Sequence, residues 1–201
     1  KVSMSVEQIQ EAVIKGRAPE VVSLVAAALE QGVAASDLLN EGLCAGMGIV
    51  GERFKKNEVF VPQVLLAARA MKQGTDLLKP HLIAAGVTPF ATAVIGTIKG
   101  DLHDIGKNLV GMMLEGAGFK VVDAGIGVAP DRFVELAQEH DARIVGVSAL
   151  LTTTMVTMRA VVEAVRAAGL PAKVIIGGAP VTQAFCDEIG ADGYSPDAAS
   201  A

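Results

Sequence analysis

The chain has 201 residues, of which 51% are hydrophobic and 19% are charged. This length suffices for one large domain or two small ones, each with its own core. The formal net charge of -5 argues against a surface that neutralises the phosphates of a nucleic acid. The apolar stretch at 21–29 is far shorter than the about 20 residues that span a bilayer. We therefore expect no nucleic-acid partner, no membrane segment and a cytoplasmic location.

The first part of the chain, residues 1–87, has apolar residues at helical spacing. Pro19 and Pro62 suit first-turn positions of helices, and Pro80 is expected to close the last helix. The pattern predicts a bundle of about four helices, followed by a linker at 84–89.

The second part, residues 88–201, alternates short β-rich runs with amphipathic stretches. The β-rich runs lie at 92–98, 120–124, 144–148, 173–176 and, more weakly, 192–195, and the helical stretches lie at 105–117, 131–140, 154–168 and 181–189. This order predicts a parallel sheet covered by helices on both faces, as in a Rossmann-like (flavodoxin-like) α/β domain.

Unusual polar residues follow the predicted strands of this domain. The loop after the first strand contains Asp101, His103 and Asp104, the third strand runs into 148–154, and the fourth ends in Gly177-Gly178. Because ligands of open α/β sheets bind beyond the carboxyl ends of the strands, these loops are expected to converge on one crevice.

A phosphate-binding loop is the first alternative for the glycine-rich segment after the first strand. Gly100 and Gly106 have five intervening residues where a P-loop needs four, and Asn108 stands where Ser or Thr would bind magnesium. The nucleotide interpretation is therefore weak.

An imidazole on a loop beside carboxylates is typical of a metal ligand. A carboxylate such as Asp101 can accept the second N–H of His103, which fixes the tautomer, while Asp104 suits the cap of the following helix. Both aspartates are too local to be assigned as direct metal ligands. A site with one protein ligand suits a cofactor that brings its own four equatorial nitrogens.

Three motifs in this order carry a family resemblance. The segments 101–106 (DLHDIG), 148–150 (SAL) and 177–178 (GG) resemble the cobalamin-binding signature of methionine synthase and the corrinoid methyl-carrier proteins. The segments 46–54 (GMGIVGERF) and 61–63 (VPQ) resemble the helical cap of the same family. The resemblance covers nearly the whole chain and implies a helical cap over 1–87 and a cobalamin-binding domain over 88–201.

The resemblance implies roles for individual residues. His103 would replace the cofactor's own base as the lower cobalt ligand, and Asp101 and Thr154 would complete a hydrogen-bonded relay with it that can store a proton. Ser148, Leu150 and Thr152 would contact the displaced base. The remaining cofactor-binding residues would be Asp104, Ile105 and Gly106 of the loop, Gly177 and Gly178 beside the cofactor's tail, and Phe54 and Val61 of the cap.

By the same resemblance, the chain binds cobalamin (methylcobalamin or a related corrinoid) base-off and His-on, and shuttles a methyl group. It would accept the group from a donor-specific methyltransferase and pass it to a second methyltransferase of the tetrahydrofolate or coenzyme M type, so it would act only together with partner enzymes. The resemblance also suggests a reductive activase as a partner. Methanol, methylamines and aryl methyl ethers all stay open as donors, and a cobalamin-binding sensor or storage protein is the alternative function.

Overall fold

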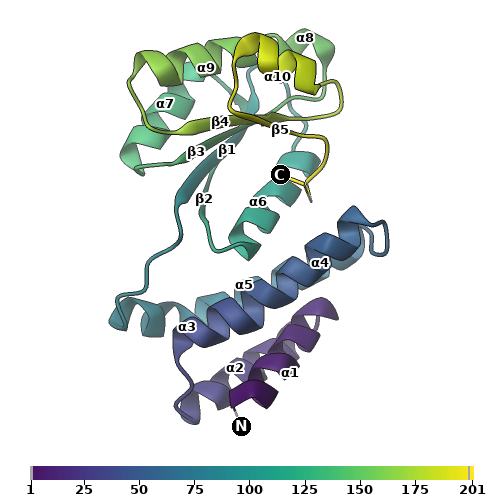
Figure 1. The fold of residues 1–201 in the computed structure, drawn as a ribbon, viewed down its shortest axis with the longest axis vertical. Helices are drawn as coiled ribbons and strands as arrows, with labels where there is room; N and C mark the ends of the chain where they lie inside the picture. The colour runs from purple at the N-terminus through teal and green to yellow at the C-terminus, as the bar shows by residue number, and fades with distance from the viewer. Residues whose placement is uncertain (1, 199) are drawn as a thin grey trace. The chain divides into compact units, whose positions relative to one another are not determined.

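A computed structural model describes residues 2–198 and 200–201. The chain divides into two compact units, one of residues up to Pro89 together with Gly116–Gly118, and one of Phe90–Glu115 together with Phe119–Ala201. The first unit is helical, and its elements are α1 (Val2–Ile14), α2 (Ala18–Glu30), α3 (Ala35–Asp37), the π-helical stretch η1 (Leu38–Cys44), α4 (Ala45–Lys55) and α5 (Val61–Ala84) (Figure 1). Since α3, η1 and α4 follow one another without a break, they form one long helical stretch.

The helical unit forms as its apolar spacing predicts. Pro19 and Pro62 lie in the first turns of α2 and α5, where the missing N–H costs nothing. Gly74 lets α5 approach its neighbours, because a Cβ at this position would lie 2.8 Å from a methyl of Leu43 and 2.9 Å from one of Val21. The predicted helical fold of the first part of the chain is thus confirmed.

Pro80 does not close the last helix, so that prediction was wrong. Helix α5 continues through Pro80 to Ala84 and ends before Gly86, whose φ of 69° is left-handed. Proline removes one backbone hydrogen bond from a helix, but Leu78 and Leu82 on either side of it are buried. Packing of this face therefore outweighs the lost bond.

The second unit is an α/β domain. Its elements are β1 (Thr92–Ile98), α6 (Ile105–Gly116), β2 (Lys120–Val128), α7 (Pro130–Glu139), β3 (Ile144–Ser148), α8 (Thr152–Met155), α9 (Met158–Ala167), β4 (Lys173–Gly177), α10 (Gln183–Ile189) and β5 (Gly193–Ser195). The strands form a parallel sheet in the order β2-β1-β3-β4-β5. The predicted α/β fold class is confirmed.

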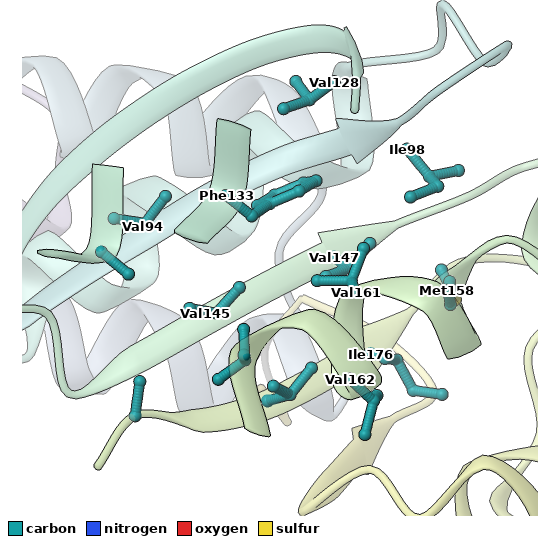
Figure 2. Close-up of a cluster of buried hydrophobic side chains, with 14 of the residues drawn as sticks. Val94, Ile98, Val128, Phe133, Val145, Val147, Met158, Val161, Val162 and Ile176 are labelled. Carbon is teal, nitrogen blue, oxygen red and sulfur yellow. The ribbon is translucent and has the colours of Figure 1, made fainter. Parts of the chain in front are cut away.

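Helices cover both faces of this sheet. Helices α7, α9 and α10 pack on one face, over a core that includes Phe133, Val145, Val161 and Ile176 (Figure 2). Helix α6 lies on the opposite face, where Leu114 packs against β1. The chain leaves β1 in one direction towards β2 and returns on its other side as β3, so the sheet order reverses at β1. Such a reversal opens a crevice at the carboxyl ends of the strands.

Two elements differ from the sequence expectation by more than two residues. Strand β2 extends to Val128 instead of ending at 124, because it pairs with β1 through two register shifts. The helix expected at 154–168 is divided into α8 and α9. In the part of the chain that the structure describes, no helix is long and apolar enough to cross a membrane.

Candidate functional site

The loops singled out in the sequence meet at the carboxyl edge of the sheet. The loop after β1 carries His103, the loop after β3 leads through Leu150 into α8, and β4 ends at Gly177 beside β3. The hydroxyl of Thr97, at the end of β1, donates a 2.7 Å hydrogen bond to the carbonyl oxygen of His103 and folds the loop back over its strand.

Asp101 is the centre of this arrangement. Its side chain is fully buried, and both carboxylate oxygens accept hydrogen bonds. Oδ1 accepts from the backbone N–H and the ring Nδ1 of His103, at 3.1 and 2.6 Å. Oδ2 accepts from the backbone N–H groups of Leu150 and Leu151, at 2.8 and 3.2 Å, and from the hydroxyl of Thr154 at 2.8 Å. One carboxylate thus joins the loops after β1 and β3.

The hydrogen bonds keep Asp101 ionised despite its burial. Burial by itself raises the pKa of this carboxyl, but hydrogen bonds from the His103 ring, the Leu150 amide and the Thr154 hydroxyl outweigh it and hold the pKa well below its usual value. An ionised carboxylate can only accept hydrogen bonds. The proton of the Asp101–His103 contact therefore belongs to Nδ1 of the imidazole.

This tautomer leaves the other ring nitrogen of His103 available. In a neutral imidazole with a protonated Nδ1, Nε2 carries a free lone pair. The His103 side chain is 53% exposed, and none of the described residues forms a hydrogen bond with Nε2. His103 is therefore a fixed, exposed nitrogen ligand supported by a carboxylate.

The residues after β3 have distinct positions. Thr154 is buried, and its hydroxyl reaches Asp101, so the extra methyl group relative to serine does not prevent the contact. Ser148 is half-buried at the end of β3, whereas Thr152 and Leu150 are exposed. The structure thus brings Thr154 to the Asp101–His103 pair and leaves the other three beside it, where contacts to a ligand stay predictions.

The two glycines after β4 differ in what surrounds them. A Cβ on Gly178, whose φ is 126°, would lie 1.8 Å from the carbonyl oxygen of Ala149, so the chain itself requires glycine at this position. A Cβ on Gly177 would lie 3.3 Å from the carbonyl oxygen of Ser195. The backbones of β3, β4 and β5 therefore approach closely here.

The start of α6 places three more residues of the motif. Asp104 precedes the helix, and its carboxylate accepts a 3.2 Å hydrogen bond from the side-chain amide of Asn108. Ile105 and Gly106 are exposed, and a Cβ on Gly106 would meet no atom within 4 Å. The backbone of α6 is thus accessible next to His103.

Phe54 and Val61 belong to the helical unit. Phe54 lies in the last turn of α4 and Val61 begins α5, and both are half-buried. Their contact with the upper face of a corrin stays a prediction of the resemblance.

The ligand atoms that the protein offers here suit a metal already held in a macrocycle better than a free metal ion. Among residues 2–198 and 200–201, no group of three or more His, Cys, Asp or Glu side chains could hold a metal ion. A single exposed imidazole is sufficient for a metal that arrives with four nitrogens of its own, as cobalt does in a corrin.

Comparison with protein families decides the identity. A model described as "B12 binding domain" matches residues 91–201, and a second model with the same description matches residues 5–79. The chain belongs to the B12-binding family of corrinoid proteins. The resemblance inferred from the sequence is confirmed, as is the corrinoid class of cofactor.

Several relatives of this corrinoid protein match nearly the whole chain. A trimethylamine corrinoid protein of Methanosarcina acetivorans is 46% identical over 178 residues, which are 87% of this chain and 82% of the relative. A dimethylamine corrinoid protein of the same organism is 42% identical over 196 residues, which are 96% and 92% of the two chains.

Two solved structures share the fold of this corrinoid protein. The methanol:cobalamin methyltransferase complex of Methanosarcina barkeri contains a chain with a TM-score of 0.88 at 31% identity, with 98% of this chain and 76% of that chain covered. A cobalamin-binding protein of Desulfitobacterium hafniense has a TM-score of 0.79 at 35% identity, with 100% and 94% covered.

Sequence reasoning missed several donors at the site of this corrinoid protein. The amide of Leu151 and the hydroxyl of Thr97 bond to the Asp101–His103 segment. A threonine among the apolar residues at the end of β1 was the available signal for Thr97. A backbone amide has no signal in the sequence, because every residue other than proline carries one.

Proposed function

We propose that this chain holds its corrinoid with His103 as the lower cobalt ligand and carries a methyl group between two methyltransferases. The main support is the state of the His103 ring, whose Nδ1 is bound by the buried Asp101 at 2.6 Å while the side chain stays 53% exposed. Nε2 is then ready to bind a metal without moving the loop.

The bound corrinoid supplies a cobalt ion that can accept and release a methyl group. His103 would present the lone pair of Nε2 to that metal, and the carboxylate of Asp101 fixes the orientation of the ring. Thr154 and the amides of Leu150 and Leu151 hold the carboxylate in place. The orientation of the imidazole that would hold the cobalt therefore depends on a network that links two loops.

The cofactor's own base has to lie elsewhere when His103 occupies the lower position. The strand ends at Ser148 and Gly177 offer small side chains beside the His103 loop, which suits a displaced nucleotide tail. The hydroxyl of Ser148 is the group that we assign to the base, with Leu150 and Thr152 beside it.

The relatives support methyltransferases as partners. Two carry the names of dimethylamine and trimethylamine corrinoid proteins, and one solved neighbour is part of a methanol:cobalamin methyltransferase complex. We therefore assign a donor-specific methyltransferase, a second methyltransferase of the tetrahydrofolate or coenzyme M type, and a reductive activase as partners. Transfer between them in the cytoplasm is part of the same proposal.

Electron paramagnetic resonance of the reduced, Co(II) holoprotein tests the axial ligand. The protein is produced with 15N-labelled histidine and reconstituted with unlabelled cobalamin. If a histidine binds cobalt, the axial nitrogen splitting changes from a three-line to a two-line pattern, because 15N has spin one half whereas 14N has spin one. If the cofactor's own base stays bound, the three-line pattern persists and the proposal is wrong.

Two variants identify which histidine is responsible, since the chain has three. His103→Ala should abolish the two-line pattern, whereas the control His140→Ala should retain it. Retention of the pattern in His103→Ala would contradict the assignment.

A further inference from the structure

Helix α6 carries a buried ammonium group just after the histidine loop. The Lys107 side chain is only 4% exposed, and its Nζ lies 2.7 Å from each carboxylate oxygen of Asp123 on strand β2. Nζ also donates to the side-chain oxygen of Asn108 at 2.7 Å. Removing an ammonium from water is costly unless its partners are well placed. Since the Asp123 side chain is 51% exposed, the pair links the buried ammonium of α6 to the solvent-facing side of the edge strand.

Asp123 also shapes the strand that follows it. Its Oδ1 accepts a 2.8 Å hydrogen bond from the backbone N–H of Gly125. Gly125 and Gly127 have φ values of 90° and 63°, and the pairing of β2 with β1 shifts register twice in this region. Residues 125–127 therefore form an irregular segment, which we call the β2 bulge.

The far end of the β2 bulge is attached to the histidine loop. The backbone N–H of Gly127 donates a 3.0 Å hydrogen bond to the carbonyl oxygen of Asp101, the residue whose carboxylate orients His103. The bulge is thus fixed at one end by the Lys107–Asp123 pair and at the other by the backbone of Asp101.

Ile126 lies between these two attachments and is left 47% exposed. The histidine loop contributes further exposed apolar side chains, Leu102 and Ile105, and the loop after β3 contributes Leu150. Exposed apolar side chains on the histidine loop, and on the two segments that are hydrogen-bonded to Asp101, favour a ligand that is apolar as well as metal-bearing. The flat underside of a corrin ring has this chemistry.

We propose that Ile126 contacts the lower face of the corrin ring, and that the Lys107–Asp123 ion pair positions Ile126 by holding the β2 bulge. This inference rests on the proposed function, because the ring lies over Ile126 only if His103 binds the cobalt. Ile126 then sets how closely the ring approaches His103. The ion pair acts on the cofactor through the bulge and does not touch it.

Cobinamide, a corrinoid without the nucleotide tail, separates ring contacts from tail contacts. Ile126→Ala should weaken the binding of cobalamin and cobinamide by a similar factor, about tenfold, because the lost contact is to the ring. Ser148→Ala should weaken the binding of cobalamin more than the binding of cobinamide, because cobinamide has no base for Ser148 to contact. Ile83→Ala, at an exposed isoleucine of the helical unit, should change neither affinity.

The ion pair has a matched control at the other end of the strands. Asp192 accepts hydrogen bonds from Lys173 and from the backbone N–H of Val174, as Asp123 does from Lys107 and Gly125. Asp123→Asn should weaken the binding of both corrinoids about threefold to tenfold. It should also lower the fraction of Co(II) holoprotein whose spectrum shows splitting by a histidine nitrogen. Asp192→Asn should leave affinity and splitting unchanged, with circular dichroism confirming that each variant is folded.

Wild-type affinity of Ile126→Ala for cobinamide would overturn the ring contact, even if Asp123→Asn failed to fold. Equal effects of Asp123→Asn and Asp192→Asn on cobinamide binding would overturn the positioning role. Wild-type holoprotein that retains the cofactor's own base on cobalt would instead overturn the proposed function, and this inference with it. If Ile126→Ala binds cobinamide more weakly and the wild-type holoprotein shows histidine nitrogen splitting, the result supports both the ring contact and the proposed function.

Discussion

At the scale of single residues, the site depends on how one buried carboxylate is satisfied. Asp101 is fully buried and ionised, and each of its oxygens has donors from a different loop. The sequence predicted the contact between Asp101 and His103 because the two residues are close in the chain. It could not predict the amides of Leu150 and Leu151, since their approach depends on how β1 and β3 pair.

Thr154 provides a test of this network. Thr154→Val keeps the shape of the side chain but leaves the buried Asp101 carboxylate without one donor, so the free energy of unfolding should fall by about 2 kcal/mol. Thr154→Ser keeps the hydroxyl and loses only a methyl group, which lies near Gly100, so its loss should be about 1 kcal/mol or less. Urea titration of the cofactor-free proteins measures both values. Equal losses in the two variants would show that the hydroxyl contributes little.

At the scale of elements, the sequence predicted the bounds of strands and helices well where they depend on local periodicity. It did not predict features that depend on the pairing of strands. Strands β1 and β3 have the predicted bounds, because each is a mainly apolar run between polar loops. The β2 bulge was missed, since its glycines acquire their function only from pairing with β1 and from the distant Lys107. The prediction that Pro80 ends the helix failed for a similar reason. The buried residues on either side of Pro80 keep this segment helical despite the proline.

Helix α6 offers a prediction that separates folding from binding. A Cβ on Gly106 would meet no protein atom within 4 Å, so Gly106→Ala should stabilise the cofactor-free protein slightly, by about 0.5 kcal/mol. If the corrin approaches the start of α6, the same variant should bind cobalamin more weakly. Thermal unfolding and cobalamin titration of one preparation measure the two effects.

Gly178→Ala is the contrasting variant for this test. Its Cβ would overlap the carbonyl oxygen of Ala149, so the cofactor-free protein itself should be strongly destabilised. If Gly106→Ala destabilised the cofactor-free protein as strongly as Gly178→Ala, the fold itself would require glycine at position 106. Unchanged cobalamin affinity in Gly106→Ala would place the cofactor away from the start of α6.

At the scale of the whole molecule, the change of periodicity near residue 88 predicted two parts with different architectures, and the three motifs predicted the family. The methyl donor could not be predicted, because a separate methyltransferase selects it and no residue of this chain contacts it in the proposed scheme. In the proposed scheme, the chain contributes a surface that the donor methyltransferase recognises. Relatives named as trimethylamine and dimethylamine corrinoid proteins are 46% and 42% identical to this chain, so we predict that a methylamine enzyme is the donor methyltransferase.

Methylation of the reduced holoprotein by separately purified donor methyltransferases tests this expectation. We expect a trimethylamine or dimethylamine methyltransferase to methylate the cofactor at least about tenfold faster than the methanol enzyme does, since a tenfold rate ratio needs only about 1.4 kcal/mol of difference in docking. Absorption spectra follow the cofactor, and release of the demethylated amine confirms the transfer. Free cobalamin at the same concentration is the control, because a rate that needs the chain identifies recognition of the protein. If none of these enzymes methylated the cofactor although the reduced holoprotein showed histidine nitrogen splitting, cofactor binding would be intact while methyl transfer was absent. That result would favour the alternative of a sensor or storage protein.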